Sequence, residues 1–233
     1  VIDILNGNSR KNKPEESRRL KIALIGNPNS GKSSVFNSLT GLNQKVANFP
    51  GVTVEKKTGF TTIKQENGES IQTEIIDLPG TYSLYPKSPE ERIPFHLLCD
   101  PNHPDHPDLT IVVADGTNLK RNLFLCSQII DLKIPVIMVI NMMDLVRFKK
   151  IEIDFKKISE RLHVPVIPMT ARKNEGLADL KKAIATEVTC VREDFIPIHT
   201  FAPEVIDHIK EWVNVKSDYN AFLVANRDRK SVV

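Results

Sequence analysis

The sequence of 233 residues has no run of about 18 apolar residues, the length that a helix needs to cross a membrane. Net charge is also nearly absent, because 32 lysine and arginine residues against 29 aspartate and glutamate residues leave +3. No basic run is longer than residues 18–21, which argues against nucleic acid as a partner. The missing apolar run predicts a soluble chain, and the weak net charge predicts a partner other than nucleic acid.

Cysteine is scarce as well, and the three that occur, Cys99, Cys126 and Cys190, show no metal-ligand spacing. An odd, scattered count is typical of reduced thiols in a cytosolic protein. Cys126 lies in an apolar helical stretch, so we expect it to pack in the core. Residues 1–20 are polar and contain Pro14, which predicts a flexible lead-in rather than a signal peptide.

The most informative segment is 26–34, Gly-Asn-Pro-Asn-Ser-Gly-Lys-Ser-Ser, directly after the apolar run 22–25. Gly-x-x-x-x-Gly-Lys-Ser between a strand and a helix is typical of a phosphate-binding loop, whose backbone N–H groups wrap a triphosphate. Lys32 can reach the β- and γ-phosphates, Ser33 can ligate Mg²⁺, and the following helix directs its positive end at the anion. The predicted nucleotide contacts here are Gly26, Asn27, Pro28, Asn29, Ser30, Gly31, Lys32, Ser33 and Ser34.

Two further segments fit the phosphate side of such a site. Residues 77–80, Asp-Leu-Pro-Gly, follow an expected strand, so Asp77 can hold Mg²⁺ and the Gly80 amide can contact the γ-phosphate, although an ordinary turn is the alternative. In the loop 48–55 we assign the hydroxyl ligand of Mg²⁺ to Thr53, whose alternative is a β-forming residue at a strand start. The predicted contacts are Gly51, Val52, Thr53, Val54, Glu55, Asp77, Leu78, Pro79 and Gly80, and the predicted Mg²⁺ ligands are Ser33, Thr53 and Asp77.

Residues 141–144, Asn-Met-Met-Asp, follow another expected strand and select the base. The Asp144 carboxylate can accept two hydrogen bonds from the N1–H and amino edge of guanine, a donor pair that adenine lacks. The motif therefore predicts GTP rather than ATP. Backbone amides at 170–172 would contact the guanine carbonyl, with a plain loop as the alternative. The predicted contacts are Asn141, Met142, Met143, Asp144, Thr170, Ala171 and Arg172.

Apolar strands alternate with amphipathic helices, which predicts an α/β fold with a mostly parallel sheet covered on both faces. The hairpin signal Asn67-Gly68 adds one antiparallel edge strand. The expected strands are 21–26, 54–64, 71–77, 109–114, 135–140 and 164–168, and the expected helices are 32–39, 89–99, 118–132, 154–162 and 177–188. Residues 43–53 are expected to form a polar loop.

We expect a GTP-binding domain over residues 21–190. Residues 191–233 carry two expected helices, 202–213 and 219–226. This second part looks too short to close its own core, so we expect it to be the truncated start of a helical domain.

Together these segments are the motif set of a Ras-like P-loop GTPase. Residues 26–37, 48–55 and 77–84 and the run Asn118-Leu119-x-Arg121-Asn122-Leu123 strongly resemble the cytosolic N-terminal GTPase domain of the bacterial ferrous iron transport protein B (FeoB) family. The resemblance is close over residues 21–188 and looser beyond them.

The resemblance implies a helical coupling domain after the GTPase domain, and then a polytopic membrane domain that moves Fe²⁺. It places the chain at the cytoplasmic face of the bacterial inner membrane, where GTP binding and hydrolysis would gate or regulate iron uptake. The implied cofactor is Mg²⁺. The implied partners are GTP and GDP, the chain's own permease domain, further copies of the chain and small cytosolic Feo proteins, but no nucleic acid.

Three positions bear on the rate of hydrolysis and on nucleotide exchange. Thr81 stands where many GTPases have the Gln that orients the attacking water, which predicts slow intrinsic hydrolysis. Met142 stands where many have a Lys over the guanine, which predicts modest affinity and quick exchange. Asn29 occupies the position that helps bind a monovalent cation in potassium-stimulated relatives, so it is our candidate K⁺ ligand, with a turn-forming role as the alternative. The residues assigned to catalysis are Lys32, Thr53, Asn29 and Gly80.

Other functions stay open at this point. One is a ribosome- or tRNA-linked GTPase, and another is a nucleotide-sensing module whose hydrolysis is incidental. His96, His103 and His106 lie in or near a proline-rich acidic segment, 100–108, for which we favour a solvated connector over a metal site.

Overall fold

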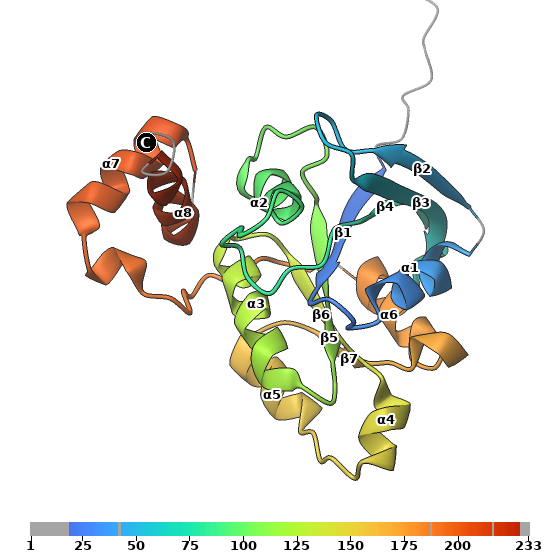
Figure 1. Ribbon diagram of the computed structural model, residues 1–233. Helices are drawn as coiled ribbons and strands as arrows, with labels where there is room; N and C mark the ends of the chain where they lie inside the picture. The colour runs from blue at the N-terminus through green and yellow to red at the C-terminus, as the bar shows by residue number, and fades with distance from the viewer. Residues whose placement is uncertain (1–18, 42, 187, 216, 229–233) are drawn as a thin grey trace, which may run out of the picture.

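The computed structural model describes residues 19–41, 43–186, 188–215 and 217–228. At its centre is a seven-stranded sheet of order β2-β3-β4-β1-β5-β6-β7, with helices on both faces (Figure 1). The strands are β1 (Leu20–Gly26), β2 (Gln44–Asn48), β3 (Glu55–Lys64), β4 (Ser70–Asp77), β5 (Leu109–Asp115), β6 (Val136–Asn141) and β7 (Val166–Pro168). The helices are α1 (Lys32–Thr40), α2 (Arg92–Cys99), α3 (Leu119–Asp131), α4 (Met143–Phe148), α5 (Phe155–Leu162), α6 (Leu177–Ala185), α7 (Pro203–Val213) and α8 (Asp218–Asp228), with short 3-10 turns η1 (Ala171–Lys173) and η2 (Ile198–Thr200).

The central strand β1 explains why helices must cover both faces. Ile22 and Leu24 lie in one buried cluster, whereas Ala23 and Ile25 lie in the other, because successive side chains of a strand point to opposite faces. All four are completely buried. β1 pairs in parallel with β4 and β5, and parallel pairing continues to β6 and β7.

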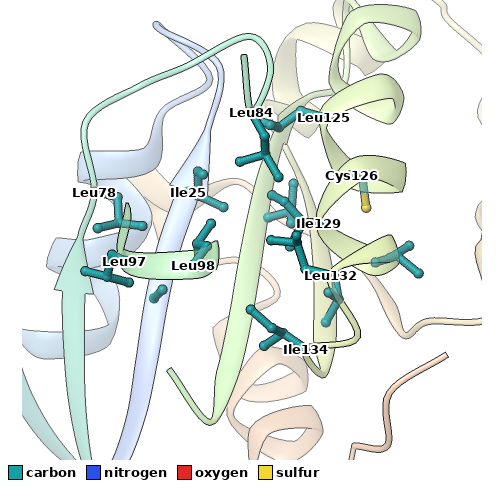
Figure 2. Close-up of a cluster of buried hydrophobic side chains, with 14 of the residues drawn as sticks. Ile25, Leu78, Leu84, Leu97, Leu98, Leu125, Cys126, Ile129, Leu132 and Ile134 are labelled. Atoms are coloured by element: carbon teal, nitrogen blue, oxygen red, sulfur yellow. The ribbon is translucent and has the colours of Figure 1, made fainter. Parts of the chain in front are cut away.

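The two clusters show which helices cover which face. One contains Phe36 of α1 and Leu180 of α6. The other contains Leu98 of α2 and Ile129 of α3, which approach the sheet from the same side in Figure 2. Cys126 of α3 is completely buried in this second cluster, which confirms its predicted packing role.

The predicted α/β fold is confirmed, with a mostly parallel sheet and antiparallel pairing at one edge. β3 and β4 form the predicted hairpin and pair antiparallel. The prediction of a loop over 43–53 is wrong in its first half, because residues 44–48 form β2, which pairs antiparallel with β3 and lies outside it. The side chains of β2 are mostly exposed, so this strand lacks the apolar alternation that would reveal it in the sequence.

Smaller differences concern the ends of elements. The short helix α4 is not predicted, because six residues are too few to show a helical period. α2 begins at Arg92 rather than at 89, and α6 ends at Ala185 rather than at 188. Of the predicted lead-in at 1–20, only residues 19 and 20 are described, and Leu20 already belongs to β1.

The helices α7 and α8 follow close to their predicted ranges and lie outside the sheet, on the side of α2 and α3 (Figure 1). Polar contacts hold α8 in place. The Ser217 hydroxyl donates to the carbonyl of Asp131, and Nδ2 of Asn220 donates to the carbonyl of Cys99 at 2.9 Å. Among the described helices, none combines the length and the apolar character needed to span a bilayer.

Candidate nucleotide-binding site

The predicted motif segments meet at the edge of the sheet where the parallel strands end. The phosphate loop 26–34 begins at the last residue of β1, and the segment 77–80 begins at the last residue of β4. The segment 141–144 begins at the last residue of β6, and residues 170–172 come shortly after β7. Since ligands of open α/β sheets bind at the carboxyl ends of the strands, the sheet brings all four segments to the expected place.

The phosphate loop takes its shape from two residues with left-handed backbone, Asn29 (φ 64°) and Gly31 (φ 82°). A Cβ at Gly31 would stand 2.2 Å from Nδ2 of Asn141, so only glycine fits between the loop and the end of β6. Gly31 also precedes α1 without offering a capping side chain. The first N–H groups of α1 are therefore left to a ligand or to water, as an anion site requires.

Two buried oxygen atoms of this loop have no hydrogen-bond partner within the described residues. They are Oδ1 of Asn27, a residue that is 5% exposed, and Oγ of Ser30, a residue that is 1% exposed. An unpaired buried polar atom costs about 1–3 kcal/mol. A loop that accepts this cost fits a bound group that completes its hydrogen bonds.

Lys32 and Asp77, predicted to contact the phosphates and Mg²⁺, form an ion pair across the site. Their side chains are 12% and 8% exposed. The pair sets an ammonium beside a carboxylate, which are the groups that phosphate oxygens and Mg²⁺ respectively require. With the exposed hydroxyl of Ser33 on the first turn of α1, the donor set consists of oxygen atoms and suits Mg²⁺.

The segment after β4 lies directly against the phosphate loop. A Cβ at Gly80 would stand 3.1 Å from the backbone nitrogen of Pro28, and the N–H of Thr81 donates to the carbonyl of Gly26 at 3.2 Å. The buried hydroxyl of Thr81 donates to the carbonyl of Ser83 at 2.7 Å. This hydroxyl is thus turned to its own segment and does not replace the missing Gln side chain.

On the base side, Asn141 joins two loops. Its Nδ2 donates to the carbonyl of Ser30 at 3.1 Å, and its Oδ1 accepts from the N–H of Ala171 at 3.0 Å. The side chain is buried, with 3% of the residue exposed. Asn141 therefore braces the phosphate loop against the loop after β7, a role that its place in the motif does not reveal.

Asp144 lies half-buried in the first turn of α4. In the part of the chain that the structure describes, no hydrogen bond or ion pair engages its carboxylate. Met142 precedes it with a left-handed φ of 63°, which is uncommon for such a side chain, and its Cε would be 3.6 Å from a Cβ at Gly31. The methionine thus reaches the phosphate loop, and the carboxylate stays available to a base.

Three contacts fix the loop after β7. Oγ of Ser38 on α1 donates to the carbonyl of Ala171 at 2.8 Å. Oγ1 of Thr170 and the guanidinium of Arg147 donate to the same Glu175 carboxylate at 2.9 and 2.6 Å, and the hydrogen bond from Arg147 lowers the pKa of Glu175. The sequence gives no sign of these supports, because each joins residues that no common motif contains.

Other predicted residues stand apart. Asn29, Thr53 and Arg172 are exposed, and within the described ranges their side chains make no hydrogen bond. The loop that carries Thr53 is anchored by the buried Phe49, whose N–H donates to the carbonyl of Val54 at 2.9 Å. The structure therefore leaves Thr53 at an exposed loop tip and does not join it to the other predicted Mg²⁺ ligands.

His103 and His106, in the segment that connects α2 to β5, make hydrogen-bond contacts within the chain. Nδ1 of His103 accepts from the N–H of Asp105 at 3.0 Å, and Nδ1 of His106 lies 3.2 Å from the carbonyl of Leu97. No group of three potential metal ligands occurs among the residues that are described. These contacts support a connector stabilised by local hydrogen bonds.

A family model, curated sequences and solved structures all match this chain to ferrous iron transport protein B. The family model of Ferrous iron transport protein B matches residues 20–184. The Fe(2+) transporter FeoB of Salmonella typhimurium is 42% identical over 168 residues, which are 72% of this chain and 21% of that protein. The cytosolic domain of L. pneumophila FeoB superposes with a TM-score of 0.73 at 36% identity, covering 88% of this chain and 80% of that one. The cytosolic domain of the T. maritima FeoB iron transporter in a GDP form also superposes with a TM-score of 0.73, at 34% identity and with the same two coverages, 88% and 80%.

Proposed function

Because this chain belongs to the ferrous iron transport protein B family, we propose that it binds GTP with Mg²⁺, hydrolyses it, and thereby regulates the movement of Fe²⁺ by a membrane domain of the same protein. The single observation that carries the nucleotide assignment is the meeting of a phosphate loop and the unengaged carboxylate of Asp144 at one edge of the sheet. The first supplies affinity for phosphate and the second selects guanine.

Isothermal titration calorimetry with GTP, GDP and ATP in the presence of Mg²⁺ tests this assignment. GTP and GDP should bind at least about 100-fold more tightly than ATP, because adenine leaves the Asp144 carboxylate without its donor pair. Equal affinities for guanosine and adenosine nucleotides would end the proposal.

When bound, Mg²⁺ would neutralise phosphate charge, held by Ser33, Asp77 and, once its loop closes, Thr53. Lys32 and the Gly80 amide would act on the γ-phosphate. Hydrolysis should be slow, because the Thr81 hydroxyl donates its one proton to the carbonyl of Ser83 and therefore cannot supply both the donor and the acceptor of a Gln side-chain amide.

We assign a K⁺ ion, held in part by Asn29, to the charge stabilisation that no arginine of the phosphate loop supplies. The exposed side chain of Asn29, which makes no hydrogen bond within the described residues, supports this role, whereas its left-handed backbone fits the turn-forming alternative. Turnover in KCl should exceed turnover in NaCl, and Asn29→Ala should abolish the difference. Equal rates in the two salts would remove K⁺ from the mechanism.

The chain spans 21% of the length of the Salmonella relative, so the role in iron transport concerns a longer protein. We propose that residues 21–190 form the GTPase domain and that 191–233 begin a helical coupling domain leading to the permease at the cytoplasmic face of the inner membrane. Further copies and small cytosolic Feo proteins are the proposed partners. Uptake of radiolabelled iron by cells carrying the full-length protein should fall when Lys32→Ala is introduced.

A nucleotide-sensing module with incidental hydrolysis is the second candidate, and the engaged hydroxyl of Thr81 favours it. Single-turnover hydrolysis separates the two. A rate that neither K⁺ nor the permease domain raises would favour the sensor. A ribosome- or tRNA-linked role has no support from a net charge of +3.

A further inference from the structure

Residues 81–85 follow Gly80, the predicted contact of the γ-phosphate. Hydrogen bonds connect this segment to α3 and, through α3, to α8. The N–H of Leu84 donates to Oε1 of Gln128 at 3.1 Å, and Nε2 of Gln128 donates to the hydroxyl oxygen of Tyr219 at 2.7 Å. The three residues are only 1%, 1% and 2% exposed. One side-chain amide thus joins the nucleotide side of the domain to the C-terminal helices through two buried hydrogen bonds.

We call these two hydrogen bonds, Leu84 to Gln128 and Gln128 to Tyr219, the relay. Ring contacts accompany it. The guanidinium of Arg121 lies 4.8 Å from the ring centroid of Tyr82, within the range of a cation–π interaction. The ring of Tyr85 meets that of Phe222 on α8 edge to face, with centroids 6.4 Å apart. Residues 82, 84 and 85 are therefore each held by α3 or α8.

The hydrocarbon packing agrees with this arrangement. Leu84 and Leu125 belong to the same buried cluster, and Figure 2 shows them facing each other between the segment and α3. Burial raises the pKa of Tyr219 far above its usual range, so its hydroxyl stays neutral.

We propose that Gln128 is a positioning residue for GTP hydrolysis and that Tyr219 is the group through which the C-terminal helices act on it. The proposal rests on the GTPase function proposed above. Residues 81–84 are anchored at both ends, because the N–H of Thr81 donates to the carbonyl of Gly26 in the phosphate loop and the N–H of Leu84 donates to Gln128. Loss of the anchor at Leu84 would let the residues between the two ends move relative to the phosphate loop. A shift of α8 that withdraws Tyr219 leaves a buried amide N–H unpaired, and the amide then turns and releases Leu84.

A purely structural contact would behave differently, and the chain offers a matched control. Ser217 also ties α8 to α3, through the carbonyl of Asp131, and is 2% exposed, but in the described structure it makes no hydrogen bond with residues 81–85. Ser217→Ala therefore removes a hydrogen bond between the start of α8 and α3 but leaves both hydrogen bonds of the relay in place.

The experiment compares Tyr219→Phe, Gln128→Leu, the double variant and Ser217→Ala in this chain. Tyr219→Phe removes one hydroxyl and should lower kcat for GTP about fivefold while KM changes less than about twofold, because an orienting contact is lost rather than a binding one. Gln128→Leu should lower kcat at least as much, and the double variant no further, because both changes break one network. Ser217→Ala should keep kcat within about twofold of the parent at a similar loss of thermal stability.

A second readout keeps the relay testable apart from hydrolysis. Amide hydrogen exchange at Leu84 should become faster in Tyr219→Phe, while the amide of Leu78, which donates to the carbonyl of Leu24, should be unchanged. Unchanged exchange at Leu84 together with unchanged kcat would overturn the relay, as would equal losses in Tyr219→Phe and Ser217→Ala. If the parent chain hydrolyses no GTP, the proposed function fails, whereas the exchange measurement still decides the relay.

Discussion

The side-chain amide of Asn141 donates to the carbonyl of Ser30 at 3.1 Å, although 111 residues separate the two in the sequence. The same amide accepts from Ala171, 30 residues further on. Two loops, which follow β1 and β7, are thus bonded to one buried side chain at the end of β6. The predicted phosphate loop and the predicted base-contacting residues are connected at this point.

Replacing Asn141 with alanine should disturb both halves of the site. The Ser30 carbonyl loses its donor and the Ala171 N–H loses its acceptor, so the free energy of unfolding should fall by about 1–3 kcal/mol. GTP binding should weaken as well, because both loops lose a fixed position. Urea unfolding and calorimetry measure the two effects. Asn102→Ala, at an exposed position whose side chain makes no hydrogen bond in the described structure, should change neither.

Asp144→Asn should change which base is bound. An amide presents a donor where the carboxylate presented an acceptor, so guanine loses its pairing partner while xanthine, with a carbonyl in place of the amino group, gains one. Competition against a fluorescent nucleotide should show GTP weakened about 100-fold and XTP strengthened. A variant that still prefers GTP would contradict the assignment of Asp144.

The ion pair of Lys32 and Asp77 predicts two separable losses. Lys32→Met should weaken GTP about 100-fold with or without Mg²⁺, because it removes a direct phosphate contact. Asp77→Asn should weaken GTP only when Mg²⁺ is present. Titrations in MgCl₂ and in EDTA distinguish the cases, and identical behaviour of the two variants would mean that Asp77 has no role at the metal.

Met142→Lys should slow nucleotide release. A lysine stem would cover the guanine face as we expect methionine to do, and its ammonium would add a cation. Stopped-flow displacement of fluorescent GDP measures the rate, and Met142→Leu serves as the uncharged control. Release at the parent rate from the lysine variant would show that position 142 does not lie over the base.

Asp131, completely buried at the end of α3, predicts a pH dependence of stability. Burial raises its pKa, although the N–H groups of Phe195 and Ile196 and the charge of Lys133 oppose the rise, and the charge of Asp194 adds to it. The folded state therefore retains a proton that the unfolded state releases near pH 3.8, so the stability that this proton contributes is fully present below that pH and is lost as the pH rises through the raised pKa. Urea unfolding from pH 3.5 to 7 should show this loss of stability in the parent chain. The loss should be smaller in Asp131→Asn, whose side chain has no carboxyl proton to release.

How much of this protein its sequence predicts depends on the range of the interactions. The sequence predicts the phosphate loop, the alternating strands and the segments 77–80 and 141–144, because each is a local pattern of turn chemistry or periodicity. It does not predict β2, whose side chains are exposed on an edge, or α4, which is only six residues long.

The sequence alone determined the α/β fold and the nucleotide loop, because apolar period and glycine spacing act between near neighbours. Only the tertiary structure decided that Asn141 braces two loops, that the Thr81 hydroxyl is engaged by Ser83, and that Gln128 connects Leu84 to Tyr219. The physical reason is that a buried hydrogen bond depends on which polar atoms packing brings within about 3 Å of each other. Chain proximity fixes that for a turn, whereas for residues 44, 91 or 111 positions apart the whole core must assemble first.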